Sequence, residues 1–347
     1  RSERVTTDTE QDITNGIIKA VTGQQRKVYF TQGHGEKDTG SSERDGYNTI
    51  AAALGRENYT LDKLVLAQQG AVPDDAAVVI VAGPRIDFLQ GEADALKKYL
   101  DKAGKVLLEL DPPDKADGAP LANLIALAHD WGVQAGNNIV VDASGMGRLI
   151  GTDASVPIAA NYPSHPITQR FSFITAFPLA REASPVSGGV NGHTAQPFIE
   201  TSPRSWAETD IKGLLTSGEV SLDENKGDKK GPITIGSAVS APAATAPAAK
   251  PGDDPNAPKP ETRVVVVGDS DFASNGILGV QGNRDLFMNI VGWLSQQENL
   301  ISIRPKEPDD RRITMTSTVQ TNVTILSLLI IPGLVFASGV YTWWRRR

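Results

Sequence analysis

The sequence contains no cysteine and only four histidines among its 347 residues. A disulfide scaffold, a thiolate zinc site and a cysteine nucleophile are therefore excluded, and a histidine-rich metal site is disfavoured. Basic residues are outnumbered, 34 against 41 acidic ones, which gives a formal net charge of -7. This balance argues against a nucleic-acid partner, because phosphate contacts require a basic surface. No P-loop, dinucleotide-binding glycine fingerprint or His-Glu-x-x-His helix occurs either, so the chain is not a P-loop ATPase.

One long apolar run lies near the carboxyl terminus. Residues 313–344 carry no charge, and a helix over 323–344 would be about 33 Å long, against about 30 Å for the hydrocarbon core of a bilayer. Trp343 and Trp344 lie where an interfacial aromatic belt is expected, and arginines 345–347 follow directly. These features predict a juxtamembrane segment (299–322), a transmembrane helix (323–344) in the inner membrane and a short tail (345–347). The positive-inside rule places the tail in the cytoplasm and the main domain outside it.

The first 25 residues have no initiator methionine, apolar signal segment or basic leader region. A domain that crosses a membrane needs a targeting element, so we expect the chain to be cut from a longer precursor. Residues 1–25 are then interpreted as an N-terminal remnant that contains a short helix over 12–21.

Apolar runs and amphipathic segments alternate through most of the remaining chain. The strongest run, Ala76 to Ala82, is ended by Gly83-Pro84 and is typical of a parallel strand that is buried on both faces. Strands are predicted at 27–31, 61–66, 76–82, 105–110, 138–141 and 263–268, and helices at 47–54, 92–103, 121–131 and 284–296. This order predicts an α/β domain over 26–150 and 263–298, with a doubly wound, mainly parallel sheet of the flavodoxin or Rossmann type.

The alternation stops between the two parts of this domain. Residues 151–240 contain short apolar stretches among proline, glycine and serine, which indicates a β-rich insertion. Residues 241–262 follow, with six prolines and seven alanines in their first twenty positions. This composition has no periodic apolar face and predicts a disordered or extended linker.

Polar residues follow the first and the last predicted strand of the α/β domain. Gln32-Gly-His-Gly-Glu36 comes after the first strand and Gly268-Asp-Ser-Asp-Phe272 after the last. Ligands of open α/β sheets bind outside the carboxyl ends of the strands, so these loops are predicted to meet around a cation or polar ligand. The candidate residues are His34, Glu36, Asp269, Asp271 and Asn275. The alternative is purely structural, with glycines in tight turns and aspartates as caps; no complete metal spacing is visible, so no metal and no cofactor is predicted.

Two enzyme templates fit poorly. Asp269-x-Asp271 after a strand is the nucleophile pattern of haloacid-dehalogenase-like phosphatases, but there it opens the domain and here it falls near the end. The turns at 82–85 and 110–113 lack the serine or cysteine of a nucleophile elbow, and Ser270 lacks its glycine frame. A non-catalytic interaction or ligand-binding subunit is therefore predicted. The alternative is a membrane-anchored, metal-dependent hydrolase that uses Asp269 and Asp271.

Five motifs in the same order carry a family resemblance. They are Thr9-Glu-Gln-Asp-Ile-Thr-Asn15, Lys27-Val-Tyr-Phe-Thr-Gln-Gly-His-Gly-Glu36, Asn161-Tyr-Pro-Ser-His-Pro-Ile-Thr168, Thr201-Ser-Pro-Arg-Ser-Trp-Ala-Glu208 and Val265-Val-Val-Gly-Asp-Ser-Asp-Phe272. Together they resemble the extracytoplasmic auxiliary proteins of uncharacterised ABC transport systems, the family similar to GldG, a gliding-motility-associated component. The resemblance implies an accessory subunit that works beside an ABC permease and an ABC ATPase, with no established catalytic residues and an unidentified small-molecule ligand.

Overall fold

The structure, a computed structural model, describes residues 26–113, 115, 118–218, 220–245, 260–296 and 325–346. The chain divides into two compact units, residues 1–304 and residues 305–347, which are described separately. The predicted helix over 12–21 and the predicted juxtamembrane segment over 299–322 lie outside the described residues.

A central sheet of seven strands organises the first unit, in the order β10-β13-β14-β4-β3-β1-β2. The strands are β1 (Arg26–Thr31), β2 (Tyr59–Leu64), β3 (Ala76–Ala82), β4 (Lys105–Glu109), β10 (Gln196–Glu200), β13 (Thr234–Pro242) and β14 (Glu261–Val267). Strands β2, β1, β3, β4 and β14 are parallel to one another, whereas β13 runs antiparallel to both β14 and β10. The predicted mainly parallel sheet is confirmed, and its finer description as doubly wound and flavodoxin- or Rossmann-like stays a prediction.

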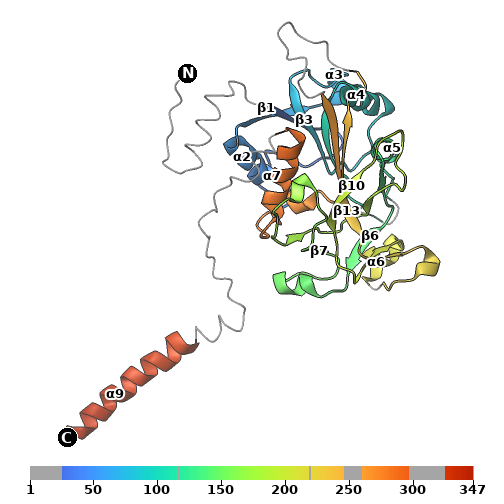
Figure 1. The fold of residues 1–347 in the computed structure, drawn as a ribbon. Coiled ribbons are helices and arrows are strands. Elements are labelled where there is room, and N and C mark those ends of the chain that lie inside the picture. The colour runs from blue at the N-terminus through green and yellow to red at the C-terminus, as the bar shows by residue number, and fades with distance from the viewer. Residues whose placement is uncertain are drawn as a thin grey trace, which may run out of the picture. The chain divides into compact units, whose positions relative to one another are not determined.

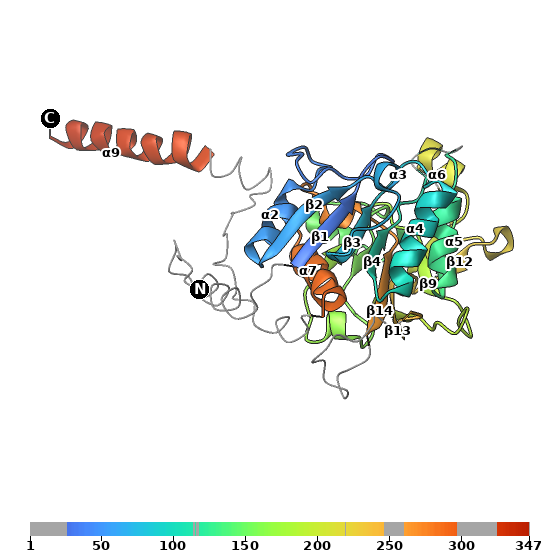
Figure 2. The ribbon, with the colours of Figure 1, turned by 90° about the horizontal axis from the view of Figure 1, so that it is seen from above.

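Both faces of the sheet are buried. Along β3, Val78 and Ile80 belong to one hydrophobic cluster, whereas Val79 and Val81 belong to another. Side chains alternate across a strand, so a strand that is covered twice must be apolar at consecutive positions. The helices are α2 (Asn48–Arg56) and α7 (Asn283–Leu294) on one face, and α4 (Gln90–Asp101) and α5 (Ala122–Asp130) on the other (Figure 2).

The predicted boundaries of the insertion and the linker differ from the structure. Two strands of the insertion, β10 and β13, extend the central sheet, while the predicted strand at 138–141 lies in a separate three-stranded antiparallel sheet. Strands β13 and β14 also continue into the predicted linker, where Ala241 pairs with Thr262 and Pro242 with Glu261. Local composition missed the outer ends of β13 and β14 because proline and alanine there show no apolar pattern, and only the pairing of the two strands defines them. Residues 246–259 of the linker lie outside the described residues.

Smaller elements gather near one end of the central sheet (Figure 1). One three-stranded sheet has the order β12-β11-β6, and two pairs are formed by β5 with β9 and by β7 with β8. Their bounds are β5 (Val133–Ala135), β6 (Ile139–Asp142), β7 (Ile158–Ala159), β8 (Thr175–Ala176), β9 (Ala183–Pro185), β11 (Ser205–Glu208) and β12 (Lys229–Lys230), with the helix α6 (Ile211–Ser217). The short helix α3 (Leu66–Gln69) lies instead beside α4.

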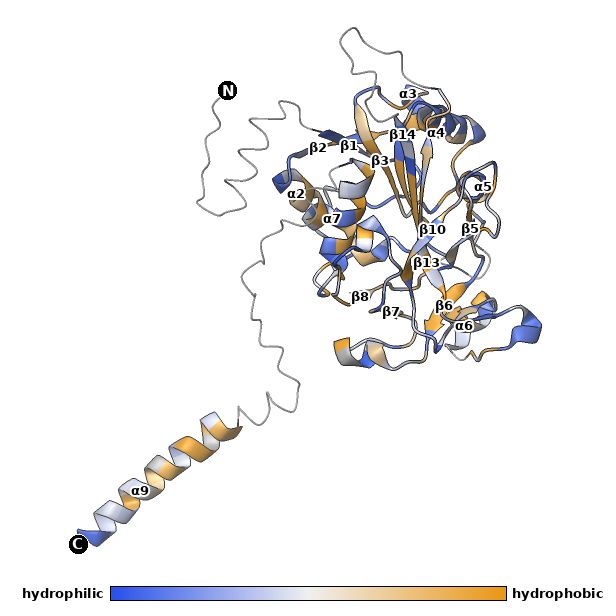
Figure 3. Ribbon diagram, viewed as in Figure 1, coloured by the Kyte–Doolittle hydropathy of each residue, from blue (hydrophilic) through white to orange (hydrophobic). Residues whose placement is uncertain are grey.

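The second unit contains one helix within the predicted transmembrane span. A π-helical stretch, η6 (Leu326–Ile330), continues directly into α9 (Ile331–Arg345). Together they form a helix that is long and apolar enough to cross a membrane, and Figure 3 shows it as apolar to neutral up to its arginine end. Pro332 lies in the first turn of α9, where the wider π turn before it tolerates the missing N–H of proline.

Candidate functional site

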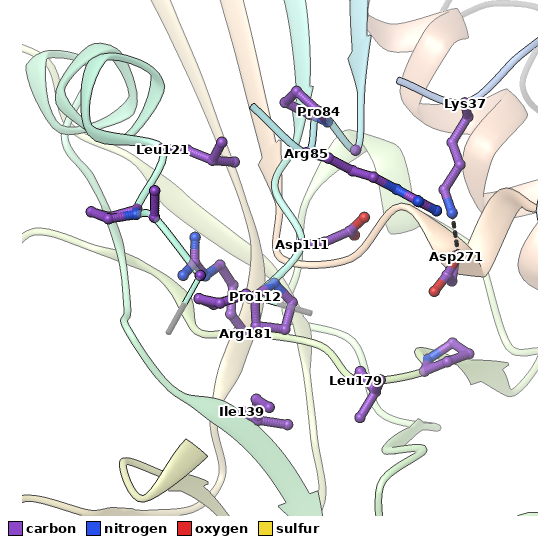
Figure 4. A pocket seen from close by; sticks show the side chains of 16 residues that line it. Lys37, Pro84, Arg85, Asp111, Pro112, Leu121, Ile139, Leu179, Arg181 and Asp271 are labelled. Carbon is purple, nitrogen blue, oxygen red and sulfur yellow. Dashed lines mark hydrogen bonds and ion pairs between the residues drawn. The ribbon is translucent and has the colours of Figure 1, made fainter. Parts of the chain in front are cut away.

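A cavity of about 160 Å³ lies at the carboxyl ends of the parallel strands. Its lining comes from the loops that follow β1, β3, β4 and β14, from Ile139 of β6, and from Pro178, Leu179 and Arg181 (Figure 4). This is the crevice in which open α/β sheets bind their ligands, because the loops that diverge from neighbouring strands leave a hollow between them. The polar residues in its lining are Lys37, Arg85, Asp111, Arg181 and Asp271.

Most of the remaining wall is apolar and rich in proline. These wall residues are Pro84, Pro112, Pro113, Pro120, Pro178, Leu121, Ile139 and Leu179, with Gly83, Gly118 and Ala119 between them. The pyrrolidine ring fixes the backbone φ of each proline, so the wall is held in one shape. A preformed pocket with a few fixed polar groups is typical of small-molecule binding.

Asp111 ties the end of β4 to the loop after β14. Its Oδ2 accepts a hydrogen bond from Ser270 Oγ at 2.6 Å, and its Oδ1 accepts one from the Ser270 backbone N–H. Burial raises the pKa of Asp111, and the nearby Asp271 carboxylate adds to this shift. Gly83 permits the contact: it has φ +60°, and a Cβ there would lie 2.2 Å from Ser270 Oγ and 2.6 Å from Asp111 Oδ2.

Lys37 and Asp271 form an ion pair on another side of the cavity (Figure 4). The Lys37 side chain is mostly buried, and burial alone lowers the pKa of a lysine. The carboxylates of Asp271, Asp111 and Asp269 outweigh that effect and raise the pKa of Lys37 above its ordinary value. Lys37 therefore stays charged and balances Asp271.

Asp269 lies buried behind Asp271 and caps the short helix η4 (Asp271–Ala273). Its Oδ1 accepts from the Asp271 N–H at 2.7 Å and its Oδ2 from the Phe272 N–H at 3.1 Å. Burial raises the pKa of Asp269 well above its ordinary value, and the charges of Asp111 and Asp271 act in the same direction. Both carboxylate oxygens are therefore engaged with backbone.

Arg181 supplies a buried cation to the cavity wall. Its side chain is 1% exposed, and its backbone N–H donates to the Gly268 carbonyl at 2.7 Å. Burial lowers the pKa of Arg181 to about 10, and the Asp111 charge opposes this shift. The guanidinium therefore remains charged at neutral pH, although its Nε is buried and has no hydrogen-bond partner in the part of the chain that the structure describes.

The five predicted site residues separate into different environments. Asp271 lines the cavity and Asp269 lies behind it, as described above. His34 and Glu36 form a second buried group with Glu92 of α4: His34 Nε2 lies 3.0 Å from Glu92 Oε2, and the His34 N–H donates to Glu36 Oε2 at 2.7 Å. Within the described part of the chain, no cluster of three or more histidine, aspartate or glutamate side chains suits a metal ion.

Asn275 joins two loops away from the cavity lining. Its Oδ1 accepts from the Thr49 N–H at 3.0 Å, and its Nδ2 donates to the carbonyls of Ser41 at 3.0 Å and Glu43 at 2.7 Å. These three bonds fix the loop over 41–46 and the first turn of α2. The role that this geometry supports is structural.

We therefore expect Asn275→Ala to lower the free energy of unfolding by about 1–3 kcal/mol, because it leaves several backbone groups unpaired. Urea unfolding of the full chain in detergent measures this change. Thr216→Ala on the exposed face of α6 is the matched control and should change stability by less than about 0.5 kcal/mol. Equal stability of Asn275→Ala and wild type would show that the three bonds contribute nothing.

Sequence reasoning missed Lys37, Asp111 and Arg181. The signal for Asp111 was present, since Asp111-Pro-Pro113 directly follows a buried strand, but the turn was tested only for a nucleophile. Lys37 follows the predicted motif by one residue. Arg181 has no local signal, because it reaches the cavity from a segment that is irregular in sequence and far from the strands it contacts.

The family comparison covers most of this first unit. The family described as "ABC-type uncharacterized transport system", an auxiliary component, matches residues 25–291. The chain belongs to this family. The predicted resemblance is thereby confirmed at the level of the family, whose description implies an auxiliary component of an ABC transport system rather than an enzyme. The link to gliding motility stays a prediction.

Solved structures are similar to this chain in fold alone. The mmIFT52 N-terminal domain has a TM-score of 0.52 at 15% identity, over 77% of this chain and 97% of that one. A thua-like protein from Bacteroides uniformis ATCC 8492 has a TM-score of 0.40 at 11% identity, over 78% and 91% of the two chains. Another, from Parabacteroides merdae ATCC 43184, has a TM-score of 0.42 at 10% identity, over 83% and 94%. A search of curated proteins gave no match.

Proposed function

We propose that this protein is a non-catalytic, membrane-anchored auxiliary subunit of an ABC transport system, with its α/β unit outside the cytoplasm. The family match over residues 25–291 carries the proposal. The helix over Leu326–Arg345 supports a membrane anchor, and the arginines that follow it favour a cytoplasmic carboxyl terminus in the inner membrane. The motifs shared with gliding-motility-associated components favour that branch of the family.

The chemistry of the cavity favours binding over catalysis. The Ser270 hydroxyl and backbone N–H both donate to Asp111, so this contact joins two loops. Among the described residues that line the cavity there is no histidine to complete a serine triad. The two aspartates of the alternative hydrolase are also engaged, Asp269 with backbone N–H groups and Asp271 with Lys37. We therefore favour an interaction or ligand-binding role, in which transport itself depends on an ABC permease and an ABC ATPase.

The helix has a means of association with a membrane partner. Helix contacts in lipid depend on close packing at small residues, and four of them lie along this segment: Ser327, Gly333, Ser338 and Gly339. A Cβ at Gly333 or Gly339 would meet no atom within 4 Å, so both positions accept a larger side chain without disturbing the helix itself. Substitution there tests association rather than folding.

We expect the full chain, extracted from its own cells in mild detergent, to co-purify with a polytopic permease and an ABC ATPase. Replacing both Gly333 and Gly339 with leucine should reduce recovery of these partners while the protein stays in the membrane fraction. A periplasm-dependent reporter fused after Gln296 should be active and one fused after Arg347 inactive. Mass spectrometry of the purified complex and reporter activity measure these outcomes.

A matched control is the double replacement of Val340 and Tyr341 with leucine, which keeps the helix apolar and leaves the glycines intact. Recovery of the wild-type protein alone in several detergents contradicts the transport assignment. Inverted reporter activities contradict the proposed orientation independently of the partners.

A further inference from the structure

The cavity contains a buried cation that the described protein does not neutralise. Arg181 is the largest of the side chains with less than 2% exposure. Its Nε has no partner, and within the described ranges its guanidinium forms no hydrogen bond or ion pair. Burying an unpaired charge is strongly unfavourable, so buried charges in proteins are normally paired. The position of Arg181 in the wall of an open cavity indicates that its counter-ion comes from outside the chain.

The neighbouring carboxylates are already engaged. Asp271 is paired with Lys37, and Asp111 accepts two hydrogen bonds from Ser270. Burial and Asp271 also raise the pKa of Asp111, which weakens its negative charge beside Arg181. The positive charge of Arg181 is therefore the excess charge of the inner cavity.

Arg85 adds a second cation at the rim. Its side chain is 66% exposed, and its guanidinium lies 3.8 Å from the Asp45 carboxylate, a long and exposed contact. Such a pair contributes little, so Arg85 is able to exchange Asp45 for a ligand. Figure 4 shows Arg85 extending along the same side of the cavity as Lys37 and Asp271.

The size and shape of the cavity limit the occupant. Its volume of about 160 Å³ is close to that of a cavity that holds one benzene-sized molecule. The planar fork of a guanidinium matches two oxygens of a carboxylate or phosphate. The proline-rich wall would contact the apolar remainder of such a ligand.

We propose that this cavity binds the oxyanion group of a small molecule, a carboxylate or a phosphate, with Arg181 as the main donor and Arg85 at the rim. The site goes beyond the transport assignment, because it stands on the geometry of the α/β unit alone. Its test requires neither the permease nor the ATPase, so the two proposals fail independently.

The test is the thermal unfolding of the full chain in mild detergent, titrated separately with inorganic phosphate and with acetate. Sodium chloride at equal ionic strength is the reference, because phosphate also stabilises proteins by exclusion from their surface. Wild type should show a saturable rise in Tm with at least one of the two anions, as expected for a ligand that binds only the native state. The anion that acts identifies the oxyanion class.

Arg181→Met removes the charge and keeps the length of the aliphatic stem. It should weaken anion binding by about tenfold or more, and without anion it should unfold at a temperature equal to or above that of wild type, because an unpaired buried charge is removed. Arg204→Met, on the exposed surface, is the matched control and should respond to the anion as wild type does. Arg181→Lys keeps the charge without the fork and should give a partial loss.

Ala119→Trp provides a second test that leaves Arg181 in place. Ala119 lines the cavity and is exposed, so a bulky side chain there should close the cavity and abolish the response even if Arg181→Met fails to fold. The proposal is overturned if wild type gives no saturable response beyond chloride, or if Arg181→Met responds as wild type does.

Discussion

Replacing Gly268 with alanine is expected to lower the free energy of unfolding by about 3 kcal/mol. A Cβ at this position would lie 2.0 Å from the Arg181 carbonyl oxygen and 2.9 Å from its carbonyl carbon. Both neighbours are backbone atoms, so no side chain can move aside to relieve the overlap. The substitution must separate the segment around Arg181 from the end of β14.

That separation also breaks hydrogen bonds on both sides of Gly268. Its N–H donates to the Ile235 carbonyl at 2.9 Å, and its own carbonyl accepts from the Arg181 N–H at 2.7 Å. Urea unfolding of the full chain in detergent measures the loss of stability. Because the change displaces Arg181, the oxyanion response described above should also weaken.

Gly55→Ala is the matched control for this substitution. Gly55 lies in α2, and a Cβ there would meet no atom within 4 Å. Alanine is the better helix former, so this variant should be more stable than wild type by about 0.5–1 kcal/mol. If Gly268→Ala is as stable as wild type, the Arg181 segment does not lie against β14 as described.

Glu109→Gln is expected to stabilise the protein increasingly as the pH rises from the ordinary pKa of a glutamate toward the raised pKa of Glu109 in the folded protein. Glu109 ends β4 and is fully buried. Burial raises its pKa well above the ordinary value, and the Asp111 charge adds to this shift. Tyr47 Oη lies 3.1 Å from Glu109 Oε2 and donates its own proton to the Ser270 carbonyl, so a protonated Glu109 can donate to the Tyr47 oxygen.

The sign of the pH dependence follows from proton binding. Above the ordinary pKa, an unfolded chain loses the Glu109 proton whereas the folded protein keeps it, so the unfolded state gains stability as pH rises. This contribution is about 1.4 kcal/mol per pH unit, and it continues up to the raised pKa of the folded state. Glutamine cannot ionise, so the substitution removes that slope, and wild type and variant should become similar in stability toward acidic pH.

Urea unfolding at several values across this pH range measures the difference between wild type and Glu109→Gln. Asp111 and Asp269 also have raised pKa values, so some slope should remain in the variant. Glu224→Gln, at an exposed turn, is the matched control and should parallel wild type. Parallel curves for Glu109→Gln and wild type would mean that Glu109 is ionised in the native protein.

Sequence patterns predicted the parts of the fold that are set by local burial. The prediction for β3 matches its observed bounds, Ala76–Ala82, because a strand covered on both faces needs consecutive apolar residues. The prediction of β2 was displaced by two residues, since its start at Tyr59 is fixed by pairing with Arg26. The hairpin of β13 and β14 was missed at its outer end, where the residues are proline and alanine and only the partner strand defines the structure.

In the candidate site, too, the order of strands and loops predicted part of the arrangement, and the remaining contacts depend on the tertiary structure. The sequence placed the loops after the first and last strands at one edge of the sheet, and the contact between Lys37 and Asp271 lies at that edge. His34 and Glu36, from the first loop, instead pack with Glu92 of α4. Whether any of the five predicted residues binds a ligand stays a prediction. Arg181, which the sequence did not indicate, is the buried cation in the cavity lining.

The sequence by itself therefore determined the absence of thiol chemistry, the apolar strands of an α/β unit, the long apolar helix and the family. These properties depend on composition or on the order of neighbouring residues. The tertiary structure alone decided which charges are paired, because Lys37 and Asp271 are separated by 234 positions and meet only where parallel strands end together. It also left Arg181 buried and without a partner among the described residues, since burial and pairing depend on contacts between segments that no local pattern specifies.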